Sequence, residues 1–97
     1  MIPSAIIDNV LNNIDTDELI ALTADLVRIN SVWDPVNGTS EQATGEKVAR
    51  WAQAQGFDVQ IEQVTPDRPN IIISGLGGTG KRTLMFEGHT DVVTPGD

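Results

Sequence analysis

The single histidine of the chain lies in a segment whose residue types could bind a metal ion. His89 follows Gly88, and Asp91 comes two residues later. A neutral imidazole can bind a metal through one ring nitrogen, while the other ring N–H donates to a carboxylate that fixes the tautomer and the orientation of the ring. Asp91 is spaced to accept that bond. On this spacing alone a structural, hydrogen-bonded histidine stays the alternative, because catalytic zinc normally needs three protein ligands.

A glycine-rich segment, residues 75–82, suggests a second chemistry because it nearly matches a phosphate-binding loop. That motif reads G-x-x-x-x-G-K followed by Ser or Thr. Lys81 fits, but Arg82 stands where the magnesium-binding hydroxyl is required. The segment also leads into a strand pattern at 84–86, whereas a phosphate loop opens a helix. A hairpin turn is therefore favoured, and nucleotide binding through Gly75–Lys81 is kept as the alternative.

Helical spacing of apolar residues predicts the elements of the N-terminal half. A short helix is expected over residues 6–14, followed by a longer helix that begins at Asp15 and ends before the loop 31–38. Asp15 can cap this helix, and Glu18 lies three residues later, as in a capping box. The apolar stripe of the longer helix is wide, so we expect this helix to be well buried.

A further helix is expected from a cap at Thr39 or Ser40 to about Gln55. Trp51 shares the apolar face of this helix, so we expect it to pack in the core. Gly56 follows the last helical residue and tolerates the left-handed conformation that often ends a helix.

The pattern then changes from helical to alternating, which predicts strands. The expected strands are residues 57–62, 70–74 and 83–87, with a loop over 65–69 between the first two. The third strand is the most apolar, which favours a central position in a sheet, with His89 just beyond its end. The short connection favours antiparallel pairing of the second and third strands.

Composition narrows the classes of function. The chain has 97 residues, 14 acidic and 6 basic, with a formal net charge of −8, so we expect neither nucleic acid nor an anionic membrane as a partner. The absence of cysteine excludes disulfides and thiolate zinc sites. We find no signal peptide and no run of apolar residues long enough to cross a membrane, so a cytoplasmic location is expected. A central third strand with no later element to cover it predicts part of a larger domain.

The residues from Gly88 to Asp97, Gly-His-Thr-Asp-Val-Val-Thr-Pro-Gly-Asp, resemble the first signature of the M20 peptidase family. That family includes acetylornithine deacetylases, succinyl-diaminopimelate desuccinylases, aminoacylases and glutamate carboxypeptidases. Thr94 stands where many members have proline, which is a loop variation. The resemblance extends back to about Asp15, and three earlier segments also look like the family: Leu26–Val32, Gln55–Phe57 and Asn70–Ile72.

The resemblance implies a fold, a metal site and an activity. Residues 1–97 would be the N-terminal portion of an α/β, zinc-exopeptidase-like, three-layer αβα catalytic domain with a mixed sheet, and the rest of that domain and the dimerisation domain would be absent. His89 would be a zinc ligand, and Asp91 a catalytic residue that orients it. The complete site would hold two Zn²⁺ ions, with Co²⁺ or Mn²⁺ as alternatives. The remaining ligands and the general base would lie beyond Asp97.

The implied reaction is hydrolysis of an amide bond in N-acyl amino acids or small peptides by a homodimeric enzyme. Taken alone, the 97-residue chain would be inactive. A non-catalytic truncated chain or binding module remains the alternative.

Overall fold

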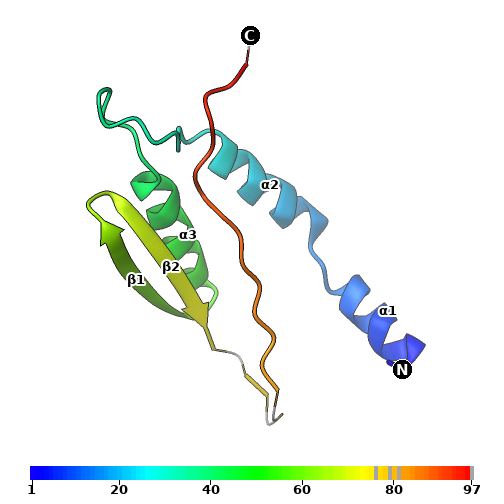
Figure 1. The fold of residues 1–97 in the computed structure, drawn as a ribbon. Coiled ribbons are helices and arrows are strands. Elements are labelled where there is room, and N and C mark those ends of the chain that lie inside the picture. Colours follow the sequence, from blue (N-terminus) through cyan, green and yellow to red (C-terminus); the bar gives the residue numbers. More distant parts are fainter. Residues whose placement is uncertain (76, 79, 81, 97) are drawn as a thin grey trace.

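The computed structural model describes residues 1–75, 77–78, 80 and 82–96. The Lys81 of the nucleotide-binding alternative and the terminal Asp97 lie outside the described residues. Three helices are followed by two strands, as Figure 1 shows: α1 (Ser4–Asn12), α2 (Thr16–Val27), α3 (Gln42–Ala54), β1 (Asp58–Thr65) and β2 (Arg68–Ser74).

Helix α3 and the β1–β2 hairpin form the packed part of the chain, with α3 in contact with both strands. Its buried positions are all small residues: Thr44, Gly45, Ala49 and Ala52. Gly45 is a glycine in mid-helix for a steric reason, because a Cβ there would lie 3.1 Å from Pro69 Cγ and 3.2 Å from Ile71 Cδ1. Small side chains thus let β2 approach the helix axis closely. Trp51, expected in the core, is only half-buried.

The hairpin is antiparallel, with Val59 opposite Ile73 and Ile61 opposite Ile71. The loop predicted over 65–69 is shorter, because Thr65 pairs with Arg68 and Gln63 with Pro69. The turn consists of Pro66 and Asp67, and Asp67 has a φ of 64°. Aspartate is among the few residues that tolerate this left-handed conformation, which allows so tight a connection.

The ends of the two longer helices follow local rules. The Asp15 side chain accepts a hydrogen bond of 3.0 Å from the backbone N–H of Glu18, which confirms the predicted cap of α2. At α3 the N-cap position is Glu41, and Ser40 Oγ accepts from the N–H of Gln42 at 3.2 Å. Gly56 has a φ of 91°, which confirms the predicted left-handed end of α3.

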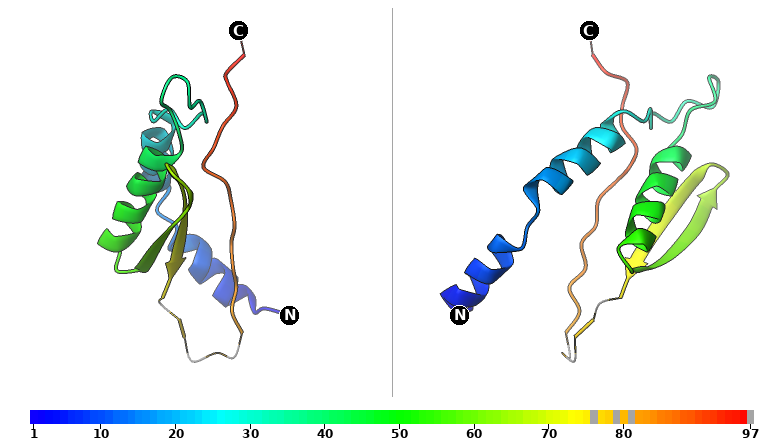
Figure 2. Two further views of the ribbon diagram at one scale, coloured as in Figure 1. Left: turned by 60° about the vertical axis from the view of Figure 1, so that its left-hand side comes forward. Right: turned by 180° about the vertical axis from the view of Figure 1, so that it is seen from behind.

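The predicted burial of α2 is wrong. No residue of α2 is buried, and Leu19, Ile20 and Val27 are all more than half exposed. Helices α1 and α2 extend away from the hairpin, as the right-hand view in Figure 2 shows. The Lys47 Nζ to Asp25 Oδ2 ion pair of 3.3 Å connects α3 to α2. The apolar stripe is real, but the described segments do not cover it.

The predicted third strand is also wrong. Residues 82–96 run as an extended segment back along the molecule toward the end of α2, without forming a strand (Figure 1). Leu84, Met85 and Phe86 are strongly exposed. The expected antiparallel pairing of the second and third strands is therefore replaced by pairing of the first and second. A strand exists only where a partner accepts its backbone hydrogen bonds, and the described residues supply none to 83–87.

The dimensions of the chain reflect this open arrangement. The radius of gyration is 16.4 Å, against about 12.5 Å expected for a compact chain of this length. The surface area is 8193 Å², against roughly 5400 Å² for a compact monomer of this mass. The architecture described is a mixture of helices and a small antiparallel sheet, compatible with an α/β fold. None of the described helices has the length and hydrophobicity needed to span a bilayer.

Candidate functional site

His89 and Asp91, the two residues singled out from the sequence, are in contact. His89 Nδ1 lies 2.8 Å from the backbone carbonyl oxygen of Asp91 and 3.2 Å from its carboxylate Oδ1. Both neighbours are acceptors, so in the neutral ring Nδ1 carries the proton and Nε2 the lone pair. This is the tautomer in which Nε2 can bind a metal ion, and the ring is strongly exposed.

Asp91 also changes the acid–base behaviour of the ring. The hydrogen bond to the Asp91 carbonyl, and next the bond to the Asp91 carboxylate and its negative charge, raise the pKa of His89 above the ordinary 6.5. The same contacts make Nε2 a better electron donor, because an acceptor at Nδ1–H increases the basicity of the ring. A proton and a metal ion would compete for that nitrogen.

The backbone after Asp91 is attached to the loop that follows α2. The Val92 N–H donates to the Ser31 carbonyl at 3.4 Å, and Val32 and Val92 form an isolated parallel bridge. Ser31 is buried. The extended segment is therefore held beside residues 31–32 at the point where it carries the histidine motif.

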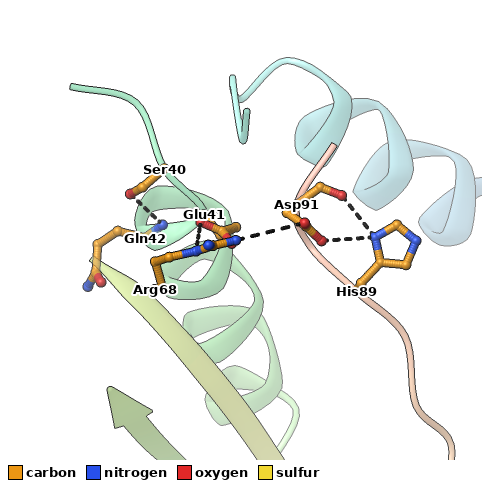
Figure 3. A network of polar contacts seen from close by, with 6 residues as sticks. All are labelled: Ser40, Glu41, Gln42, Arg68, His89 and Asp91. Atoms are coloured by element: carbon orange, nitrogen blue, oxygen red, sulfur yellow. Dashed lines mark hydrogen bonds and ion pairs between the residues drawn. The ribbon is translucent and has the colours of Figure 1, made fainter. Parts of the chain in front are cut away.

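Arg68, the first residue of β2, lies on the other side of Asp91 (Figure 3). Its Nη2 and Nε donate to Glu41 Oε1 at 2.6 and 2.8 Å, and Nε is 3.2 Å from Oε2. Its guanidinium also stacks over the Trp33 ring, with Cζ 4.5 Å from the ring centroid. The Glu41 hydrogen bond raises the pKa of Arg68 further above its already high value. Arg68 Nη2 is 3.9 Å from Asp91 Oδ2, an ion pair longer than a hydrogen bond.

An open groove of about 730 Å³ lies alongside these residues. One side is formed by Glu41 and β2, and the other by residues 85–91, including His89. Its volume is within the range of about 300–1,000 Å³ that is typical of small-molecule sites. The groove combines apolar walls with the charged groups of Arg68, Glu41 and Asp91.

Comparisons with curated proteins find relatives of the chain. It is 38% identical over 71 residues to acetylornithine deacetylase of Vibrio cholerae serotype O1, which is 73% of this chain and 17% of that protein. It is 37% identical over 60 residues to acetylornithine deacetylase of Vibrio vulnificus, 62% of this chain and 15% of that protein. It is 35% identical over 78 residues to succinyl-diaminopimelate desuccinylase of Methylocella silvestris, 80% of this chain and 19% of that protein.

The chain is homologous to M20 enzymes. The family resemblance drawn from the sequence is confirmed. The matched segment spans less than a fifth of the length of each of these relatives. No family model matches the chain, and no solved structure matches it.

The donor set fits one ligand of an M20 zinc site rather than a complete one. Asp91 accepts the hydrogen bond from His89 Nδ1–H, which leaves the lone pair of Nε2 available to bind a metal ion. Across residues 1–75, 77–78, 80 and 82–96, no three histidine or carboxylate side chains are grouped closely enough to hold an ion. The metal role of His89 and the catalytic role of Asp91 remain predictions.

Sequence reasoning missed Arg68 and Glu41. Arg68 falls in the segment predicted as a loop, and its partner Glu41 is 27 residues away. Neither belongs to a motif with a recognisable spacing. Two signals identify them, and only the folded chain displays these. One is a bidentate ion pair to a glutamate residue that is only 6% exposed, and the other is a tryptophan stacked on the arginine.

Proposed function

We propose that this chain provides the first metal ligand of a zinc-dependent amide hydrolase that removes an acyl group from N-acyl amino acids. We choose N-acetylornithine and N-succinyl-diaminopimelate as test substrates because the relatives are named for acting on them. The observation that carries the proposal is the His89–Asp91 contact, with Nδ1 bonded and Nε2 free to ligate, in a chain that has deacylases among its relatives.

The residues of this chain would act by holding and tuning the metal. His89 would bind it through Nε2, and Asp91 would keep the ring in the required tautomer and increase its electron donation. When bound, zinc lowers the pKa of a water molecule and polarises the amide carbonyl. The groove beside His89 would receive the substrate.

The whole-protein properties stay within the proposal. We propose that the further ligands and the general base are supplied by other parts of the active enzyme, that it acts as a homodimer in the cytoplasm, and that residues 1–97 alone do not turn over substrate. The scarcity of metal donors in the described part of the chain supports this last statement.

The test uses the natural full-length product that carries this sequence. Zinc content and hydrolysis of both acylated substrates would be measured for the wild type, for His89→Ala and for Arg50→Gln. Arg50 is an exposed arginine on α3 that does not line the groove. We expect His89→Ala to lose most zinc and at least about 100-fold in kcat/KM, and Arg50→Gln to behave like the wild type. Unchanged zinc content and turnover in His89→Ala would overturn the proposal.

A further inference from the structure

Arg68 is fixed in place from two sides. The Glu41 carboxylate accepts hydrogen bonds from two of its nitrogens, and the indole of Trp33 lies against the guanidinium. Bidentate pairing and stacking use the planar shape of the guanidinium, which lysine lacks. Glu41 is buried and lies at the N-terminal end of α3. The arginine is therefore anchored to the packed part of the chain.

The free side of this anchored charge faces Asp91. Arg68 Nη2 lies 3.9 Å from Oδ2, while Oδ1 lies 3.2 Å from His89 Nδ1. The two oxygens of one carboxylate thus face two different groups, as Figure 3 shows. A positive charge near Oδ2 favours the rotamer of Asp91 that keeps Oδ1 directed at the imidazole.

We propose that Arg68 is a positioning residue, which holds Asp91 in the orientation that keeps His89 Nδ1 bonded and Nε2 free for the metal. Glu41 and Trp33 connect this arrangement to α3 and to the loop after α2, so the packing of the hairpin sets the orientation of the histidine. The inference rests on the proposed function, because the positioning role presupposes that His89 binds a metal ion.

The experiment measures zinc affinity of the natural full-length product by competition with a chromogenic chelator. Asp91→Asn is expected to weaken binding about 10- to 100-fold, as for other carboxylates behind a ligating histidine. Arg68→Gln is expected to weaken it about two- to fivefold, the range for a partly exposed ion pair. Arg50→Gln is the matched control, because its ion pair to Glu46 is also 3.9 Å long but lies away from the groove.

A double-mutant cycle separates positioning from a merely structural role. If Arg68 acts through Asp91, Arg68→Gln has no further effect on zinc affinity in the Asp91→Asn background. Equal losses in the two backgrounds, or wild-type affinity in a folded Arg68→Gln protein, would overturn the inference. If Arg68→Gln does not fold, Arg68→Lys takes its place in the same cycle, since lysine keeps the charge but not the planar fork.

His89→Ala distinguishes the two levels of the argument. If His89→Ala binds zinc as the wild type does, the proposed function fails, and the positioning role fails with it. If His89→Ala loses zinc while Arg68→Gln and Arg68→Lys both bind it normally, only the positioning role fails.

Discussion

Replacing Gly45 with alanine tests how closely β2 must approach α3 to bring Arg68 to the site. Gly45 is buried in the middle of α3 and faces the start of β2. An alanine Cβ would lie 3.1 Å from Pro69 Cγ and 3.2 Å from Ile71 Cδ1. Carbon atoms at their best separation are about 3.5–4.0 Å apart, so the new methyl is too close to both.

Two opposing effects set the size of the change. Alanine favours the helix over glycine by about 1 kcal/mol. Crowding in a packed interior costs about 1–3 kcal/mol. Ile71 can rotate its terminal methyl, but the Pro69 ring is buried and moves only with the strand. We therefore expect Gly45→Ala to lower the free energy of unfolding by about 1 kcal/mol, with crowding exceeding the helix gain.

The assay is urea unfolding followed by tryptophan fluorescence, since Trp51 lies within α3. The helix term is measured separately by comparing Arg50→Ala with Arg50→Gly at an exposed position of the same helix. Their difference should be about 1 kcal/mol. Pro69→Ala removes the nearest atom, so Gly45→Ala should be at least about 0.5 kcal/mol less costly in that background.

One result would refute this reasoning. Suppose that Gly45→Ala raises the free energy of unfolding by the full difference measured between Arg50→Ala and Arg50→Gly. In that case Pro69 and Ile71 accommodate the new methyl group with no loss of stability. The close approach of β2 to α3 would then not depend on glycine, and the position of Arg68 would have to be explained by its own contacts with Glu41.

Two further predictions follow from local geometry. The pKa of His89, measured by NMR, should lie above 6.5 and fall in Asp91→Asn, without returning fully to normal because the backbone carbonyl contact remains. Because folding raises this pKa, the protonated ring stabilises the folded chain fully below pH 6.5, and this stabilisation is lost as the pH rises through the pKa of the folded state. A fall in stability on acidification across that range in the wild type, but not in His89→Ala, would contradict this direction. Gly56→Ala should destabilise the chain by about 1 kcal/mol, because φ is 91° there, and thermal unfolding should show a milder loss for Gly56→Asn.

The sequence predicted most of the local structure because local interactions decide it. The cap of α2 depends on Asp15 and Glu18, three residues apart, and the end of α3 depends on one glycine. The first two strands were also predicted, although β2 begins two residues before the predicted 70–74. The turn between them is shorter than predicted because Asp67 adopts a left-handed conformation, which aspartate permits but does not require.

The errors concern elements whose state depends on distant partners. An apolar stripe predicts that α2 will be covered, and an apolar run predicts that 83–87 will pair, but neither pattern says by what. In the folded chain, α2 has no buried residue and Leu84, Met85 and Phe86 are strongly exposed. Burial and strand pairing are properties of two surfaces, so one segment cannot determine them.

The candidate site shows the same division. The sequence by itself determined the His89–Asp91 pair, because two residues at that spacing can form their contact within one extended segment. Only the tertiary structure decided that Arg68 faces Asp91, since this requires the hairpin to pack on α3 and residues 31–32 to hold Val92. An ion pair between residues 23 positions apart depends on the path of the whole chain between them, and no local pattern encodes that path.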